Sequence, residues 1–158
     1  MAIADMFLKV EGVTGEASDA DHKGQIDVMS WSWAMDAPVT MTTGAAAGMV
    51  SVGELHIVKH VDQSSPTLMR FLRNRKPVSS AQLIVRKAGT TPLEYFTIDL
   101  QNVRINGLRA ESHDSELIEH VRLGFQKMRV SYTPQGTTGA RGGGANQFET
   151  DAHLGEGS

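Results

Sequence analysis

The amino-acid sequence predicts an all-β domain with one helix, a compact antiparallel β-barrel carrying a short flanking α-helix. Three observations lead to this prediction. Apolar and polar residues alternate along most of the chain, as they do in half-buried strands. Several of these runs exchange their apolar face midway, which requires a bulge or a bend. One short segment has helical spacing instead. Alternation over this length is typical of a barrel or a sandwich, and the bends favour the barrel.

Alternation defines the predicted strands in order along the chain. In the first run, Met6, Leu8 and Val10 face one side while Phe7 and Lys9 face the other. The later runs cover residues 26–35, 49–61, 81–85, 96–100 and 121–133. We expect these runs to be the strands of the barrel.

The exchange of faces is clearest in two of these runs. In 49–61 the apolar positions change parity at Gly53. In 121–133 the change follows Phe125, and Met128 begins the new apolar set. Because a shift of one residue turns every later side chain to the opposite face, each exchange predicts a bend in its strand.

Residues 65–73 predict the single helix. Ser65 is placed to act as the N-cap and Pro66 occupies the first helical position. Leu68, Phe71 and Leu72 then follow at i, i+3 and i+4, which places them on one face. We expect a short amphipathic helix packed on the barrel.

Two segments are predicted to be loops. Residues 37–48 connect two strong strands and are longer than a hairpin requires, and long loops on rigid scaffolds often carry function. Residues 134–158 are rich in glycine and have no periodicity. We therefore predict a barrel domain over residues 1–133 and a flexible C-terminal tail over 134–158.

Composition excludes several classes of partner and site. The net charge is −3 and the charges are interspersed, so no concentrated basic surface indicates a nucleic acid or an anionic membrane. The absence of cysteine excludes disulfides, thiolate zinc sites and cysteine nucleophiles. No apolar run approaches the ~20 residues that span a bilayer, and the N-terminal residues lack the features of a signal peptide. We expect the chain to fold in the cytoplasm and to need a machine for any export.

The candidate metal ligands His56 and His60 do not have the spacing of a metal site. Their segment alternates as a strand, so residues four apart would lie ~13 Å apart, too far to share one metal. We interpret them as exposed polar positions on a half-buried strand.

No other motif predicts an enzyme or a cofactor site. The stretch 111–120 contains His113, His120 and several carboxylates, but it lacks a nucleophile and the spacing of a calcium loop. We expect a solvated loop there. The glycine clusters at 44–48 and 139–144 lack the lysine and hydroxyl residue of a phosphate-binding loop. We predict no catalytic residues, no metal and no cofactor.

Trp31 and Trp33 share one face of a predicted strand. Core packing is the commoner use of such a pair, because each ring buries a large apolar area. Ser30, Ser32 and Ala34 lie on the opposite face. That face is small, hydroxylated and uncharged, which suits a surface that slides past cargo or holds it loosely.

Residues 3–133 strongly resemble the haemolysin-coregulated protein (Hcp) family, in uninterrupted order. The segments that carry the resemblance are Asp5-Met-Phe-Leu-Lys-Val-Glu-Gly-Val-Thr-Gly-Glu16, His22, Ile26-Asp-Val-Met-Ser-Trp-Ser-Trp33, Lys59-His-Val-Asp62, Ser65-Pro66-Thr-Leu68, Arg86-Lys-Ala-Gly89, Glu94-Tyr-Phe96, Glu119-His-Val-Arg-Leu-Gly-Phe125 and Val130-Ser-Tyr132. The glycine-rich tail matches no motif of the family.

The resemblance implies the structural subunit of the inner tube of a type VI secretion system. Members of the family form homo-hexameric rings that stack into a hollow tube inside a contractile sheath, with a spike protein at the tip. Contraction expels the tube into the medium or a target cell, and small effector proteins travel in the lumen. Such a protein is secreted without a signal peptide and is not an enzyme.

The resemblance also implies two sets of functional residues. The family's extended loop contributes to contacts between stacked rings and corresponds here to residues 37–48. The expected contact residues are Met41, Thr42, Thr43, Gly44 and Met49. Lumen-facing positions follow from the resemblance combined with strand alternation. They are Ser30 and Ser32.

Two other functions fit parts of the sequence. A small-molecule-binding β-barrel would place Trp31 and Trp33 in its mouth, and would be a monomer or dimer with an open apolar cavity. A hydrolase would use His113 or His120. Self-association discriminates between these functions, because a closed ring requires a heterologous interface.

Overall fold

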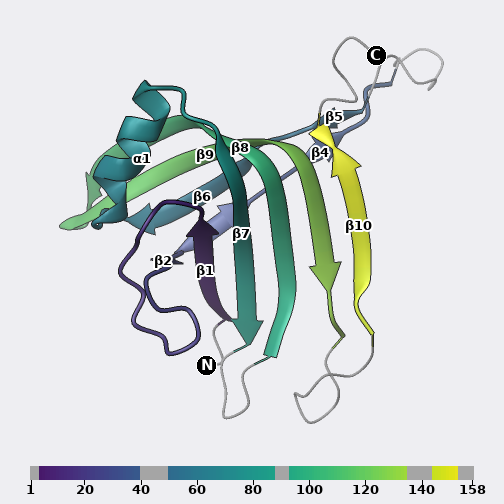
Figure 1. Cartoon of the computed structure of the whole chain (residues 1–158), viewed down its shortest axis with the longest axis horizontal. Coiled ribbons are helices and arrows are strands. Elements are labelled where there is room, and N and C mark those ends of the chain that lie inside the picture. Colours follow the sequence, from purple (N-terminus) through teal and green to yellow (C-terminus); the bar gives the residue numbers. More distant parts are fainter. Residues whose placement is uncertain (1–3, 40–49, 88–92, 135–143, 153–158) are drawn as a thin grey trace.

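Most strands of the computed structural model form one curled antiparallel sheet with a helix against it (Figure 1), which confirms the predicted fold class. The structure describes residues 4–39, 50–87, 93–134 and 144–152. The helix is α1 (Ser64–Arg73). The strands are β1 (Ala4–Val10), β2 (Ile26–Asp27), β3 (Ser30–Ser32), β4 (Met35–Asp36), β5 (Ser51–Val52), β6 (Leu55–His60), β7 (Val78–Lys87), β8 (Leu93–His113), β9 (Glu116–Tyr132) and β10 (Asn146–Asp151).

The order of the strands brings the two margins of the curled sheet together. Neighbouring strands follow the order β2-β1-β7-β8-β9-β6-β3, β10 pairs with β9, and β4 and β5 form a separate two-stranded ribbon. Between β2 and β3, the Val28 N–H donates to the Met6 carbonyl at 3.0 Å and the Met29 N–H donates to the Val58 carbonyl at 2.8 Å. The segment 26–32 therefore joins β1 to β6.

A corner crosses β7, β8 and β9 along one line. Each strand has two buried residues three positions apart at this line, which strict alternation forbids. These pairs are Val78 and Ala81, Val103 and Leu100, and Phe125 and Met128. Asn102 lies on the line with a left-handed φ of 52°, and its amide donates to the Gln126 side chain. The predicted exchange after Phe125 is thus confirmed as one part of a bend shared by three strands.

The exchange predicted at Gly53 is also confirmed. Residues 53 and 54 separate β5 from β6, and Leu55 begins the buried set. The Gly53 N–H donates to the Ala34 carbonyl at 2.9 Å. A Cβ at this position would lie 2.7 Å from the same oxygen, so only glycine permits this approach.

Helix α1 buries the predicted face but begins differently from the prediction. Leu68 and Phe71 are buried in the core. Ser65 lies in the first turn and does not cap the helix. Instead, Asp62 Oδ1 accepts the Ser64 N–H at 2.8 Å, and Ser65 Oγ accepts the Asp62 N–H at 3.0 Å. This reciprocal pair satisfies backbone donors at the start of the helix, as a capping box does.

Strand β10 lies within residues 134–158, which we predicted to be a flexible tail. Its residues pair antiparallel with β9, with Phe148 opposite Val130. Phe148 is the only large apolar residue of the strand, so the sequence has no alternation that would have predicted β10. None of the helical residues in the described ranges forms a segment long and apolar enough to cross a bilayer.

Candidate functional site

One outward face of the sheet carries the two residues predicted to line a lumen. Ser30 and Ser32 on β3 are both exposed, whereas Trp31 between them packs against the core. The predicted alternation of this strand is therefore confirmed. That Ser30 and Ser32 face a lumen stays a prediction.

This face continues from β3 across β6 and β9. In one row of cross-strand neighbours, Ser32 lies beside His56, which lies beside Arg122. Its charges are compensated locally, because Arg122 Nη1 lies 2.8 Å from Glu54 Oε1. Ser30 begins the adjacent row. The result is a polar face without a concentrated field of either sign.

The acidic stretch 111–120 is a hairpin rather than the solvated loop that we predicted. Strand β8 continues to His113 and β9 begins at Glu116, so Asp114 and Ser115 form a two-residue turn. Both turn residues have left-handed φ angles, 48° and 67°, as a type I′ turn requires. Because the residues next to the turn are polar on both faces, alternation did not predict these parts of the two strands.

Within this hairpin the structure brings one predicted histidine and one carboxylate together. His120 Nε2 lies 3.3 Å from Glu111 Oε1, and Arg109 Nη1 lies 2.8 Å from the other oxygen of the same carboxylate. His113 is exposed at the end of β8. These contacts match surface charge pairing, and no nucleophile accompanies them among the contacts of the described residues.

His56 and His60 are exposed positions on β6, as predicted. Within the described ranges, no three His, Cys, Asp or Glu side chains gather as a metal site would require. The predicted stacking residues Met41, Thr42, Thr43, Gly44 and Met49 lie outside the described residues. The ribbon of β4 and β5 flanks their segment, with Met35 paired to Val52.

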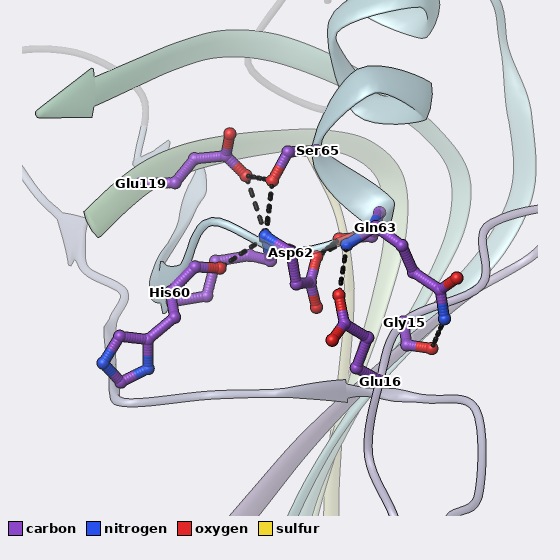
Figure 2. A network of polar contacts seen from close by, with 9 residues as sticks. Gly15, Glu16, His60, Asp62, Gln63, Ser65 and Glu119 are labelled. Carbon is purple, nitrogen blue, oxygen red and sulfur yellow. Dashed lines mark hydrogen bonds and ion pairs between the residues drawn. The ribbon is translucent and has the colours of Figure 1, made fainter. Parts of the chain in front are cut away.

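A buried ionic network that we did not predict joins β6, α1 and β9. Lys59 and Glu119 have no exposed side-chain surface, and Lys59 Nζ lies 2.9 Å from Glu119 Oε1. The same ammonium donates to Asp62 Oδ1 at 3.1 Å, to Ser65 Oγ at 3.2 Å and to the His60 carbonyl at 2.9 Å (Figure 2). A sequence signal existed, because Lys59 has the inward parity of Leu55 and Ile57.

The segment 11–25 is held to the sheet by a second network around Arg86. The guanidinium makes two contacts with the Asp19 carboxylate, at 3.0 and 2.5 Å, and one with Asp5 at 3.1 Å. The hydrogen bond from Arg86 is the main cause that lowers the pKa of Asp19 to about 2. Nearby, His22 stacks on the Phe7 ring.

The two tryptophans take part in packing rather than lining an open site. Trp31 stacks on Phe96 with ring centroids 5.3 Å apart, and Trp33 Nε1 donates to the Gly53 carbonyl at 2.8 Å. A groove of about 590 Å³ on the described surface has charged residues such as Lys9 and Arg129 in its walls, and neither tryptophan lines it. The binding-barrel alternative is not favoured.

Comparisons with known proteins agree with the sequence resemblance. Residues 7–132 match the family model described as "Type VI secretion system effector, Hcp". Protein hcp1 of Pseudomonas aeruginosa is 38% identical over 149 residues, which cover 91% of this chain and 92% of the relative.

Solved structures show the same fold. The chain is similar to the crystal structure of a type VI secretion system effector from Yersinia pestis, with a TM-score of 0.77 at 30% identity, over 93% of this chain and 99% of that one. It is also similar to the crystal structure of Hcp1 from Salmonella typhimurium, with a TM-score of 0.78 at 28% identity, over 99% of each chain.

Proposed function

The chain belongs to the Hcp family of type VI secretion proteins, and from this premise we propose that it forms six-membered rings that stack into a hollow tube. Its function is that of a structural tube subunit of the secretion system, and it is not an enzyme. The observation that carries this conclusion is the family match across residues 7–132, together with a fold that agrees over almost the whole chain.

The polar face that starts at Ser30 and Ser32 is the wall of the lumen in this proposal. Its small hydroxyl groups offer weak hydrogen bonds to many protein surfaces. The compensated charge of Arg122 avoids a strong field that would trap a charged cargo. Such a wall suits small effector proteins that are carried and then released.

The remaining partners belong to the same proposal. A spike protein closes the tip of the tube, and contractile sheath proteins surround it and drive its expulsion. The chain folds in the bacterial cytoplasm and leaves through this machine without a signal peptide. It is a secreted protein whose export depends on sheath contraction.

We assign the contacts between stacked rings to Met41, Thr42, Thr43, Gly44 and Met49, on the resemblance alone. Replacing Met41 and Thr42 with aspartate places charges where one ring would meet the next. We expect rings to persist and tubes to disappear in electron micrographs of the purified variant. Tubes as long as those of the wild type would overturn the assignment of this loop.

The test of the proposed function is export in the native host. The chain is followed by immunoblot in the medium and in the cells, with and without the gene for the contractile sheath protein. We expect it in the medium only when the sheath is present, while a cytosolic marker stays inside in both strains. Equal export without the sheath would contradict the proposal.

A further inference from the structure

Three histidines lie close together on the polar face of β6 and β9. His56 and His60 on β6 flank Val58, and His120 on β9 is the cross-strand neighbour of Val58. Side chains at cross-strand positions and at alternate positions of one strand point to the same face of a sheet. Strand β3, which carries the two serines of the proposed lumen wall, continues the rows of Val58 and His56. We call His56, His60 and His120 the histidine face.

The histidine face is open to solvent and lies beside carboxylates. The His60 side chain is 52% exposed, and its Nε2 lies 3.4 Å from Glu116 Oε2. The His120 side chain is 35% exposed, and its Nε2 lies 3.3 Å from Glu111 Oε1. His56 is exposed as well. In Figure 2 the His60 ring points away from the buried ionic network. The three rings therefore gain and lose protons without any change in the core.

The other charges around the histidine face have a weak negative balance. The arginines in or next to these rows are Arg104, Arg109 and Arg122, and the carboxylates are those of Asp27, Glu54, Glu111, Asp114 and Glu116. Two of the arginines are already paired, Arg122 with Glu54 and Arg109 with Glu111. When the histidines are neutral, the carboxylates therefore outnumber the cations.

Acid reverses this balance. Histidine is the side chain whose charge ordinarily changes between pH 5 and 8, whereas arginine and ordinary carboxylates keep their charge over most of that range. Three protonated histidines bring the cations above the carboxylates in number. Burial raises the pKa of Asp27, so the loss of its negative charge in acid acts in the same direction. In a ring, the reversal is repeated in every copy.

We propose that the histidine face holds effector proteins with a basic surface at neutral pH and releases them in acid. At neutral pH, the lysines and arginines of such a cargo meet the surplus of carboxylates, and the hydroxyls of Ser30 and Ser32 accept hydrogen bonds. In acid, the protonated histidines pair with these carboxylates and repel the cargo. This assignment of the cargo rests on the proposed function, in which this face lines the lumen.

The test measures how tightly a peptide of ten lysines binds at pH 7.5 and at pH 5.5. The charge of this probe is the same at both values, so any change in affinity comes from the protein. Isothermal titration calorimetry at low ionic strength gives the Kd. Light scattering checks that the native mass is the same at both pH values, and thermal unfolding checks the fold of each variant.

The variants separate the histidine face from the rest of the surface. One variant replaces His56, His60 and His120 together with asparagine. Its control, His113→Asn, removes an exposed histidine at the end of β8 that lies outside the histidine face. A second pair compares two carboxylates. Glu116→Gln removes the partner of His60, and Glu149→Gln removes a carboxylate that is paired with Arg129 on another part of the sheet.

We expect the wild type and His113→Asn to bind the peptide roughly tenfold more weakly at pH 5.5 than at pH 7.5. The triple histidine variant should bind equally at both pH values, as tightly as the wild type does at pH 7.5. Glu116→Gln should weaken binding at pH 7.5 more than Glu149→Gln does.

Four outcomes would overturn the proposal. They are no binding at either pH, a wild-type Kd that does not rise in acid, a pH dependence that survives in the triple variant, and an equal effect of the two glutamine variants. Each of them leaves the ring and its export intact. A wild-type chain that does not assemble would instead contradict the proposed function, so the two failures give different results.

Discussion

At the residue scale, the Lys59–Glu119 pair is the most consequential interaction inside the subunit. Both side chains are fully buried, so removing one leaves the other as an uncompensated charge in a medium that solvates it poorly. We expect Lys59→Ala to lower the free energy of unfolding by about 3–5 kcal/mol, measured by urea denaturation.

Replacing both partners gives the control for this prediction. Lys59→Met combined with Glu119→Leu removes both charges and keeps an apolar volume, so its stability should lie closer to the wild type than that of Lys59→Ala. If Lys59→Ala loses no more stability than the double variant, the pair is not the anchor of α1 that the geometry indicates.

The lowered pKa of Asp19 predicts how the stability of the fold depends on pH. Its pKa falls from 3.8 to about 2 because Arg86 donates hydrogen bonds to the ionised carboxylate. As the pH falls, Asp19 therefore binds a proton in the unfolded chain before it does so in the folded chain. The contribution of Asp19 to stability is fully present above pH 3.8 and is lost as the pH falls towards 2. Thermal unfolding between pH 5 and 2 should show a shallower decline in Asp19→Asn than in the wild type. Parallel curves would contradict the role of Arg86.

Ser32 tests the proposed lumen wall. Ser32→Gln enlarges an exposed side chain without adding charge, so the ring should keep its native mass. We expect less effector protein to co-purify with the variant rings, measured by quantitative mass spectrometry. Loss of the ring would show that Ser32 supports assembly instead, and an unchanged yield of effector would remove it from the lumen wall.

Sequence analysis at this scale succeeded where burial follows parity and failed where polar groups are buried. Ser30, Ser32, Trp31 and Leu68 have the burial that alternation or helical spacing predicts. Lys59 shares the inward parity of its strand, but a buried lysine is credible only once Glu119 is known to face it. That contact joins residues 60 positions apart, and no local pattern contains it.

At the scale of elements, the shared bend of β7, β8 and β9 gives the sheet its curl. Asn102 occupies the bend with φ of 52°, a conformation in which a β-branched residue is strained. We expect Asn102→Val to be about 1–2 kcal/mol less stable in urea denaturation than Asn102→Gly, because glycine adopts this conformation freely.

Equal stability of the valine and glycine variants would show that this strand adopts another conformation at position 102. Both variants lose the side-chain contact with Gln126, so the comparison isolates the backbone conformation. The control is needed because the loss of that contact alone would destabilise either variant.

The elements that sequence analysis missed share one property, the lack of an apolar pattern. The bends at Gly53 and after Phe125 were predictable because apolar residues flank them on both sides. The hairpin around Asp114 and strand β10 carry few apolar residues, and β10 also pairs with residues of β9 that lie well before it in the sequence. Such strands read as loops until the sheet beside them is known.

At the scale of the whole molecule, a subunit that must form rings needs surfaces beyond those that its own core covers. Within the described residues, large apolar side chains such as Met35, Tyr132 and Phe148 remain exposed. Fold and family were predictable from the sequence because the matching segments span the chain. The surfaces through which copies of the chain meet were not predictable, because an exposed residue that contacts another copy has no sequence pattern that distinguishes it from other exposed residues.

The native mass of the purified chain tests the central claim most directly. Light scattering behind a sizing column should give about six times the 17.1 kDa of one chain, independent of the expression host. A mass of one chain that persists up to the highest concentration reached would contradict the account, because a tube cannot be built from subunits that do not form a ring.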